Sequence, residues 1–221
     1  ISKWIPAYEQ ASGTKINYSP IGSGGGIAAI TARTVDFGAS DAPLSPDQFA
    51  ACKGCVQIPW ALSATAVIYN VPGAPQGLKL TPALIAQIYL GFVQKWNAPG
   101  IRKLNPGVNL PDLKITPVYR SDSSGTSYNF TEFLTKTSPT WKSRVGTGTT
   151  VSWPTGIGAR GSSGVTGVEK VIRALRQLRD RHLRRKKNQS LNSDFRHAVP
   201  STVKSIVKKV KTLAGKAAAA N

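Results

Sequence analysis

Segments typical of strands alternate with segments typical of helices along the first three quarters of this chain, and this alternation restricts the fold more than any other feature. Apolar or alternating runs predict strands at Lys15–Ser19, Val35–Ala39, Val56–Tyr69 and Ile115–Tyr119. Helical spacing predicts helices at Trp4–Gln10, Ile27–Ala32, Pro46–Ala51, Ala83–Leu90 and Ser127–Leu134. Thr81 and Pro82 supply an N-cap and a first residue for the fourth of these helices. The pattern predicts an α/β architecture, in which ligands bind where loops leave the carboxyl ends of the strands.

The first strand-to-helix junction is the run Gly22–Gly26. Ser23 offers a hydroxyl group, and Gly22 and Gly24 let the backbone approach an oxyanion closely. Glycine-rich turns are common, so without other evidence the run is typical of a flexible loop.

The second junction is the run Arg120–Ser127. Arg120 provides a forked cation, and Asp122 can hold its guanidinium in place. The residues at the start of the following helix can donate N–H and O–H groups to an anion, and they are Ser124, Gly125 and Thr126. The other interpretation is a capped helix beside a surface ion pair.

Asp41 follows the apolar run Val35–Ala39. An acidic residue at the end of a strand commonly caps the next turn. In an anion site, its carboxylate would repel a fully ionised anion and accept a hydrogen bond from one that still carries a proton. Asp41 would therefore select HPO4²⁻ or H2PO4⁻ over sulfate.

Positive charge is concentrated in the last quarter of the chain. The net charge is +19, and residues 1–168 hold 14 Lys and Arg against 7 Asp and Glu, whereas residues 169–221 hold 15 against 3. Apolar residues in the last segment recur at helical spacing on both sides of Pro200 and predict two basic amphipathic helices. Such helices bind nucleic acid or an anionic membrane surface in some proteins and are solvated faces in others.

Hydrophobic residues make up 40% of the 221 residues, enough for a buried core. No stretch approaches the roughly 20 apolar residues that span a bilayer. The first residues, Ile1–Trp4, do not have the pattern of a signal peptide. We therefore expect the chain to begin as a mature product or within a domain.

The cysteines form one pair, Cys52 and Cys55, with Lys53 and Gly54 between them. This spacing occurs in redox-active sites, in half of a zinc site and in small local disulfides. Zinc needs further ligands, and the two histidines, His182 and His197, both lie in the basic segment. A structural disulfide formed in an oxidising compartment is the favoured interpretation, and a spectator thiol pair is the next.

Several longer motifs link the two junctions to one known family. They are Gly22–Gly26, Thr34–Leu44, Ile88–Gly91, Lys95–Asn97, Lys103–Gly107, Arg120–Ser127 and Val145–Gly148. In content and order, these motifs resemble those of the phosphate-binding proteins of phosphate ABC transporters, and the resemblance covers residues 1–168.

The resemblance implies a partial, two-lobed fold of the periplasmic-binding-protein type, with residues 1–72 in the first lobe, 73–168 in the second and a basic helical tail at 169–221. It implies a monomer in the periplasm or on the exterior of the cell envelope, which binds inorganic phosphate without a metal or cofactor and delivers it to a membrane permease. The phosphate-binding residues it implies are Ser23, Asp41, Arg120, Ser124, Gly125 and Thr126, supported by Gly22, Gly24 and Asp122.

The family also carries a Gly-Ala-Thr-Phe-Pro segment ahead of the first helix and continues well beyond residue 168, so we expect this chain to be incomplete. The family's Ala-Ile-Gly-Tyr-Val strand, read one base out of register in GC-rich codons, gives Arg-Asp-Arg-Leu-Arg-Arg, which is close to residues 179–185. The alternative function is therefore a truncated or frameshifted remnant that transports nothing and whose tail binds nucleic acid or an anionic membrane surface.

We expect no enzymatic activity. Ser124 and Cys55 are the candidate nucleophiles, but residues 1–168 contain no histidine that could activate either of them.

Overall fold

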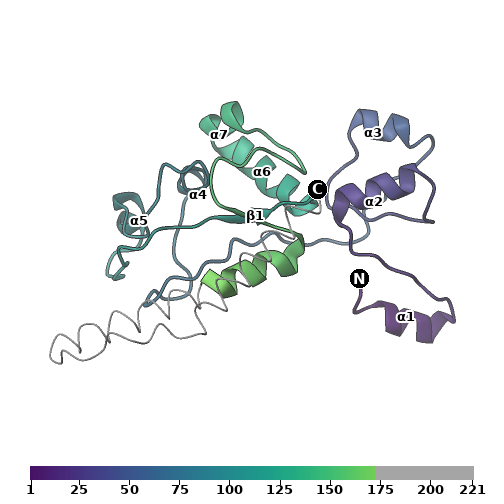
Figure 1. Ribbon diagram of the computed structural model, residues 1–221, viewed down its shortest axis with the longest axis horizontal. Helices are drawn as coiled ribbons and strands as arrows, with labels where there is room; N and C mark the ends of the chain where they lie inside the picture. The colour runs from purple at the N-terminus through teal and green to yellow at the C-terminus, as the bar shows by residue number, and fades with distance from the viewer. Residues whose placement is uncertain (173–221) are drawn as a thin grey trace, which may run out of the picture. The chain divides into compact units, whose positions relative to one another are not determined.

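Residues 1–172, the part of the chain that the computed structural model describes, form short helices and a small parallel sheet joined by long irregular segments (Figure 1). The labelled helices are α1 (Ile5–Ser12), α2 (Gly22–Thr31), α3 (Pro46–Ala51), α4 (Pro82–Tyr89), α5 (Pro99–Leu104), α6 (Gly125–Thr137) and α7 (Pro139–Arg144). The strands are β1 (Val118–Arg120) and β2 (Ile157–Ala159), and residues 161–172 are helical. The tail predicted at 169–221 lies outside the described residues except for its first four, so its two helices stay a prediction.

The sheet brings two strand-to-helix junctions to the same edge. β1 and β2 pair in parallel, with Arg120 beside Ala159. The Ser121 N–H donates to the Ala159 carbonyl at 3.1 Å and continues the pairing past the end of β1. α6 follows β1, and the helix at 161–172 follows β2, so both helices begin near the carboxyl ends of the strands (Figure 1).

The buried core lies mainly in the second half of the described residues. α4 and α7 both pack against α6 around a cluster of Ala86, Leu90, Leu134 and Trp141 (Figure 1). A second cluster uses another face of α4 and consists of Val71, Ile88, Trp96, Ile101, Leu110 and Ile115. This packing holds α6 in place, and it thereby fixes the helix N-terminus that the site uses.

The helices predicted around α1, α3, α4 and α6 are confirmed. Thr81 caps α4 by accepting from the Leu84 N–H, and Pro82 is its first residue. α1 is capped at its C-terminus by Gly13, whose φ of 70° is the left-handed conformation that glycine tolerates best. α6 begins two residues earlier than predicted, because Ser124 caps the helix and so starts it at the next residue.

The interpretation of Gly22–Gly26 as a loop is wrong, because this run forms the first turns of α2. The glycines allow close approach to neighbouring chain segments. A Cβ atom at Gly26 would lie 2.7 Å from the Ala39 carbonyl oxygen, so a side chain there would push that segment away.

The strands predicted at 15–19, 35–39 and 56–69 are not formed within residues 1–172, and the one predicted at 115–119 is formed in part, as β1. The run at 56–69 carries alternating apolar residues, yet Val56, Ile58, Trp60 and Leu62 are all exposed. Alternation predicts which face of a strand is apolar, but a strand exists only where a neighbouring strand accepts its backbone hydrogen bonds. Among the described residues no such neighbour is present. The lobe boundary at residue 72 stays a prediction.

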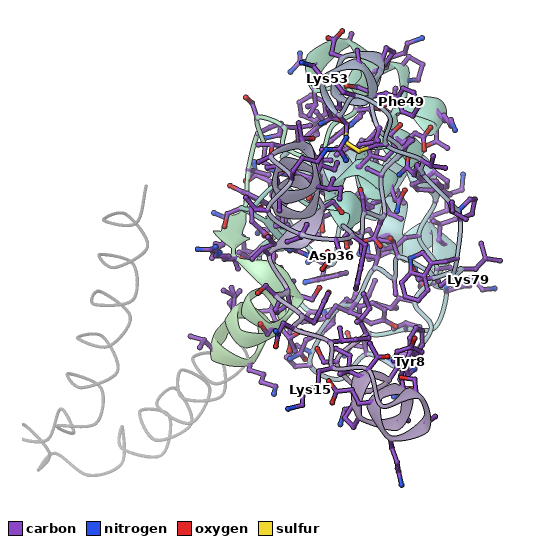
Figure 2. The ribbon with its side chains drawn as sticks, turned by 90° about the vertical axis from the view of Figure 1, so that its right-hand side faces the viewer. Tyr8, Lys15, Asp36, Phe49, Lys53 and Lys79 are labelled. Carbon is purple, nitrogen blue, oxygen red and sulfur yellow. A yellow bond between two sulfur atoms is a disulfide. The ribbon has the colours of Figure 1, made fainter. Side chains whose placement is uncertain are left out.

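Cys52 and Cys55 are joined by a disulfide directly after α3, beside Lys53 and Phe49 (Figure 2). Among the helices of residues 1–172, none combines the length and the apolar character needed to cross a bilayer.

Candidate functional site

The residue at the carboxyl end of β1 is Arg120, and it forms a two-pronged pair with Asp122. Arg120 Nε donates to Asp122 Oδ1 at 2.6 Å, and Nη2 donates to Oδ2. The two side chains are only 13% and 17% exposed. The hydrogen bond from Arg120, assisted by one from the Gly161 N–H at 3.0 Å, lowers the pKa of Asp122 to about 2. The pair therefore stays ionised across the physiological range.

Arg120 keeps donors for a ligand after these bonds are made. A guanidinium carries five N–H donors, of which Asp122 takes two. Nη1 donates a third to the Ser162 hydroxyl at 3.4 Å. Among the described residues, two N–H groups then remain without an acceptor, one on each terminal nitrogen, and this is the fork that suits two oxygens of one oxyanion.

The N-terminus of α6 supplies the next group of donors. Its N-cap, Ser124, is almost fully buried, and its own N–H is held by the Thr149 carbonyl at 2.9 Å. The first turn of a helix leaves backbone N–H groups without a partner inside the helix and carries a partial positive charge. The Thr126 N–H has no acceptor among the described residues. This helix end is therefore suited to an anion.

Ser23 joins the two junctions that the sequence suggested separately. It is buried near the start of α2, and its Oγ accepts from the Gly125 N–H at 3.0 Å and from the Asp41 N–H at 3.1 Å. Its own O–H has no acceptor within residues 1–172 and can donate to a ligand. A Cβ atom at Gly125 would lie 2.5 Å from both Ser23 Oγ and Asp41 Cβ, so this contact requires glycine.

Asp41 lies at the exposed rim of this group. Its carbonyl accepts from the Asn129 amide at 3.3 Å, which ties it to α6. The pKa of Arg120 is raised first by its hydrogen bond to Asp122 and, to a smaller extent, by the negative charge of Asp41. The Asp41 carboxylate is thus within electrostatic reach of the guanidinium.

The structure brings the six predicted binding residues together, and the predicted supporting residues lie beside them. Gly22 faces the pair, since a Cβ atom there would lie 3.1 Å from Asp122 Oδ2. The Gly24 N–H donates to the Ser123 carbonyl at 3.2 Å. The proximity of these residues is observed, and their contact with phosphate stays a prediction.

Three further residues of this region were not predicted from the sequence: Thr149, Gly161 and Ser162. The last two open the helix that follows β2 and contact the pair formed by Arg120 and Asp122. A signal was present, because residues 161–164 are another glycine- and serine-rich run at the start of a helix. Thr149 gave no such local signal, and only the fold places it against residues 123 and 124.

Within residues 1–172, no three side chains of His, Cys, Asp or Glu gather closely enough to hold a metal ion. Ser124 Oγ serves as the cap of α6, and Cys55 is bonded to Cys52.

Comparison with known proteins gives consistent matches. A family model described as the PBP superfamily domain matches residues 1–220. The chain is 48% identical over 165 residues to the phosphate-binding protein PstS of Xylella fastidiosa, a match that covers 74% of this chain and 45% of that protein. It is 46% identical over 164 residues to PstS of Pasteurella multocida, covering 74% and 47%. It is 37% identical over 172 residues to PstS of Methanocaldococcus jannaschii, covering 74% and 44%. The chain thus spans about half the length of these relatives.

Proposed function

The chain belongs to the PBP superfamily, and we propose that it binds inorganic phosphate as the substrate-binding component of a phosphate ABC importer. Relatives that are up to 48% identical over the aligned residues are named as phosphate-binding proteins. The observation that carries the proposal is the meeting of Ser23 and Asp41 at the N-terminus of α6, with Arg120 at the end of the preceding strand and beside Gly22. These residues combine a cation, free helix N–H groups and hydroxyls with one carboxylate, which is the composition that a partly protonated oxyanion requires.

In the bound state, Arg120 places its two remaining N–H groups on two phosphate oxygens. The N–H groups of Gly125 and Thr126 and the hydroxyls of Ser23 and Ser124 donate to the others. The Gly125 N–H donates to Ser23 Oγ in this structure, and it exchanges this acceptor for a phosphate oxygen when the ligand binds. Binding is by hydrogen bonds alone and breaks no covalent bond, so the protein acts as a carrier and performs no catalysis.

Asp41 sets the selectivity of the site. Its carboxylate accepts the O–H of HPO4²⁻ or H2PO4⁻, whereas sulfate at neutral pH carries no proton to donate. With sulfate in the site, the Asp41 carboxylate and the sulfate oxygens would face each other as two negative groups without a hydrogen bond. This repulsion excludes sulfate in favour of phosphate.

The location, oligomeric state and partner that we propose for this protein come from the same family resemblance. We place the protein in the periplasm or on the exterior of the cell envelope, as a monomer that passes phosphate to a membrane permease. For the complete site we expect a Kd of about 1 μM or tighter, which corresponds to about −8 kcal/mol.

Equilibrium dialysis with radiolabelled phosphate tests the proposal. The wild-type chain should retain phosphate, and Arg120→Ala should bind at least about 30-fold more weakly, because a charged hydrogen-bonding group is lost. Arg102→Ala is the matched control, since Arg102 is an exposed residue of α5 and belongs to neither junction. Equal retention by the wild type and Arg120→Ala would refute the site, and no retention by a folded wild type would refute the function.

A further inference from the structure

The turn that carries Asp41 is bound by the side chain of Gln57, which follows the Cys52–Cys55 disulfide by two residues. We propose that Gln57, itself held by the Cys52–Cys55 loop, positions Asp41 and so determines how well the site separates phosphate from sulfate. This inference rests on the proposed function, and it gives the cysteine pair a role that phosphate binding alone does not require.

Gln57 bridges the two sides of the turn that contains Asp41. Its Nε2 donates to the Ala42 carbonyl at 3.1 Å, and its Oε1 accepts from the Leu44 N–H at 2.9 Å. The Ser40 hydroxyl also binds Ala42, accepting from its N–H at 3.0 Å and donating to its carbonyl at 2.8 Å. Ala42 is 2% exposed, so the middle of this turn is anchored in the protein, whereas Gln57 lies on the exposed side of the turn.

The anchoring fixes Asp41 on the side that faces the ligand. Asp41 directly precedes Ala42, and its N–H is bound to Ser23 Oγ at 3.1 Å. The carboxylate is therefore placed between a bond to Ser23 and a turn held by Gln57. Without Gln57, the Ala42 carbonyl and the Leu44 N–H lose their long-range partner. The turn then keeps the Ser40 hydroxyl and the two backbone bonds of Asp41, to Ser23 and to Asn129.

The disulfide fixes the segment from which Gln57 reaches. Cys52 is 1% exposed and ends α3, and its bond to Cys55 closes a short loop two residues before Gln57. Arg33 holds the same loop, since its Nη2 donates to the Cys52 carbonyl at 2.7 Å and to the Lys53 carbonyl at 2.8 Å. The loop is seen beside the label of Lys53 in Figure 2.

Arg33 connects this loop to the helix that starts in the site. It lies two residues past the end of α2, and Ser23 lies at the beginning of the same helix. The disulfide loop is therefore tied to the site twice, through Arg33 to α2 and through Gln57 to the Asp41 turn. Loss of the disulfide loosens the second tie most directly, because a single residue separates the second cysteine from Gln57.

Reduction by a dithiol supplies a reversible way to remove the disulfide. The reductant gives up two electrons and two protons, the S–S bond breaks, Cys52 and Cys55 become thiols, and the reductant closes its own disulfide. Cys55 is only half-buried, so its sulfur is open to attack by a thiolate.

The test is a set of phosphate and sulfate titrations on the full chain. Gln57→Ala should raise the Kd for phosphate about tenfold and reduce the ratio of sulfate Kd to phosphate Kd. Gln87→Ala should change neither, because Gln87 is an exposed glutamine on α4 with no part in the turn. Dithiothreitol, or the double substitution Cys52→Ser and Cys55→Ser, should raise the phosphate Kd about threefold in the wild-type background.

The decisive comparison combines the two changes. If the disulfide acts through Gln57, breaking it in Gln57→Ala should change the phosphate Kd by less than about twofold. The inference would be overturned if the two changes raised the phosphate Kd by factors that multiply. It would also be overturned if Gln57→Ala kept the wild-type ratio of sulfate Kd to phosphate Kd. Either result would leave the proposed function intact. Failure of the wild type itself to bind phosphate would instead reject the proposed function.

Discussion

The pair formed by Arg120 and Asp122 links the stability of the protein to pH. The pKa of Asp122 is lowered from its ordinary value of 3.8 to about 2, chiefly by the hydrogen bond from Arg120. A carboxyl whose pKa is lowered by folding stabilises the folded state above its unfolded pKa and loses that effect as pH falls through the folded pKa. The shift corresponds to about 2 kcal/mol.

We therefore expect the free energy of unfolding to fall by about 2 kcal/mol between about pH 4 and pH 2 on account of this one group. Asp122→Asn should remove that part of the pH dependence and should already be less stable at neutral pH. Urea unfolding across this range measures both effects. Asp36→Asn serves as control, because Asp36 is exposed and is seen in Figure 2 on a loop after α2. An unchanged pH profile in Asp122→Asn would contradict the assignment.

Gly125 is the residue at which the two junctions touch. The Cβ atom of an alanine there would lie 2.5 Å from Ser23 Oγ and Asp41 Cβ, so the two segments would have to move apart. Gly125→Ala should weaken phosphate binding at least about tenfold while far-UV circular dichroism stays unchanged, because alanine favours a helix more than glycine does. Gly167→Ala, where a Cβ atom meets nothing within 4 Å, should bind as the wild type does. Full binding by Gly125→Ala would show that this contact is not part of the site.

At the scale of single elements, the N-cap of α4 offers a clean test of local stability. Thr81 accepts from the Leu84 N–H, and no other hydroxyl within residues 1–172 serves that group. Thr81→Ala should lower the free energy of unfolding by about 1 kcal/mol. Thr140→Ala, on an exposed residue of α7 whose hydroxyl makes no bond within the described part of the chain, should stay within about 0.5 kcal/mol. Equal unfolding midpoints for both variants would contradict the role of the cap.

The helices were predictable from the sequence because their signals are local. Thr81 with Pro82 marks the start of α4, and Gly13 marks the end of α1, each within one turn of the helix it bounds. The segments at 15–19, 35–39 and 56–69 were wrongly predicted as strands, because a strand depends on a partner that can lie anywhere in the chain. β1 forms because β2, which lies much later in the sequence, pairs with it.

The candidate site, like the fold, was predictable from the sequence only where its signals are local. The residue types at Gly22–Gly26 and Arg120–Ser127 predicted an anion site without any knowledge of the fold. The hydrogen bond between Ser23 and Gly125 spans 102 residues of sequence, and no local pattern predicts it. The bond from the N–H of residue 161 to the carboxylate of residue 122 depends in addition on the pairing of β1 with β2.

For the molecule as a whole, stability depends on the core around α4, α6 and α7. Trp141 is fully buried there, and its Nε1–H donates to the Gly146 carbonyl at 2.9 Å. Trp141→Ala should cost about 3–5 kcal/mol, since it leaves a large cavity. Trp60→Ala is the matched control and should cost about 1 kcal/mol, because Trp60 is 61% exposed and packs edge-on against Trp4. Differential scanning calorimetry measures both, and similar melting temperatures for the two variants would contradict this view of the core.

The central claim is that residues far apart in the chain form one site selective for partly protonated phosphate. Isothermal titration of the purified chain with phosphate, and separately with sulfate, tests it most directly. We predict heat of binding with phosphate and none with sulfate, and we predict that Asp41→Asn loses this discrimination. No heat with phosphate from a chain that circular dichroism shows to be folded, or equal binding of the two anions by the wild type, would contradict the account.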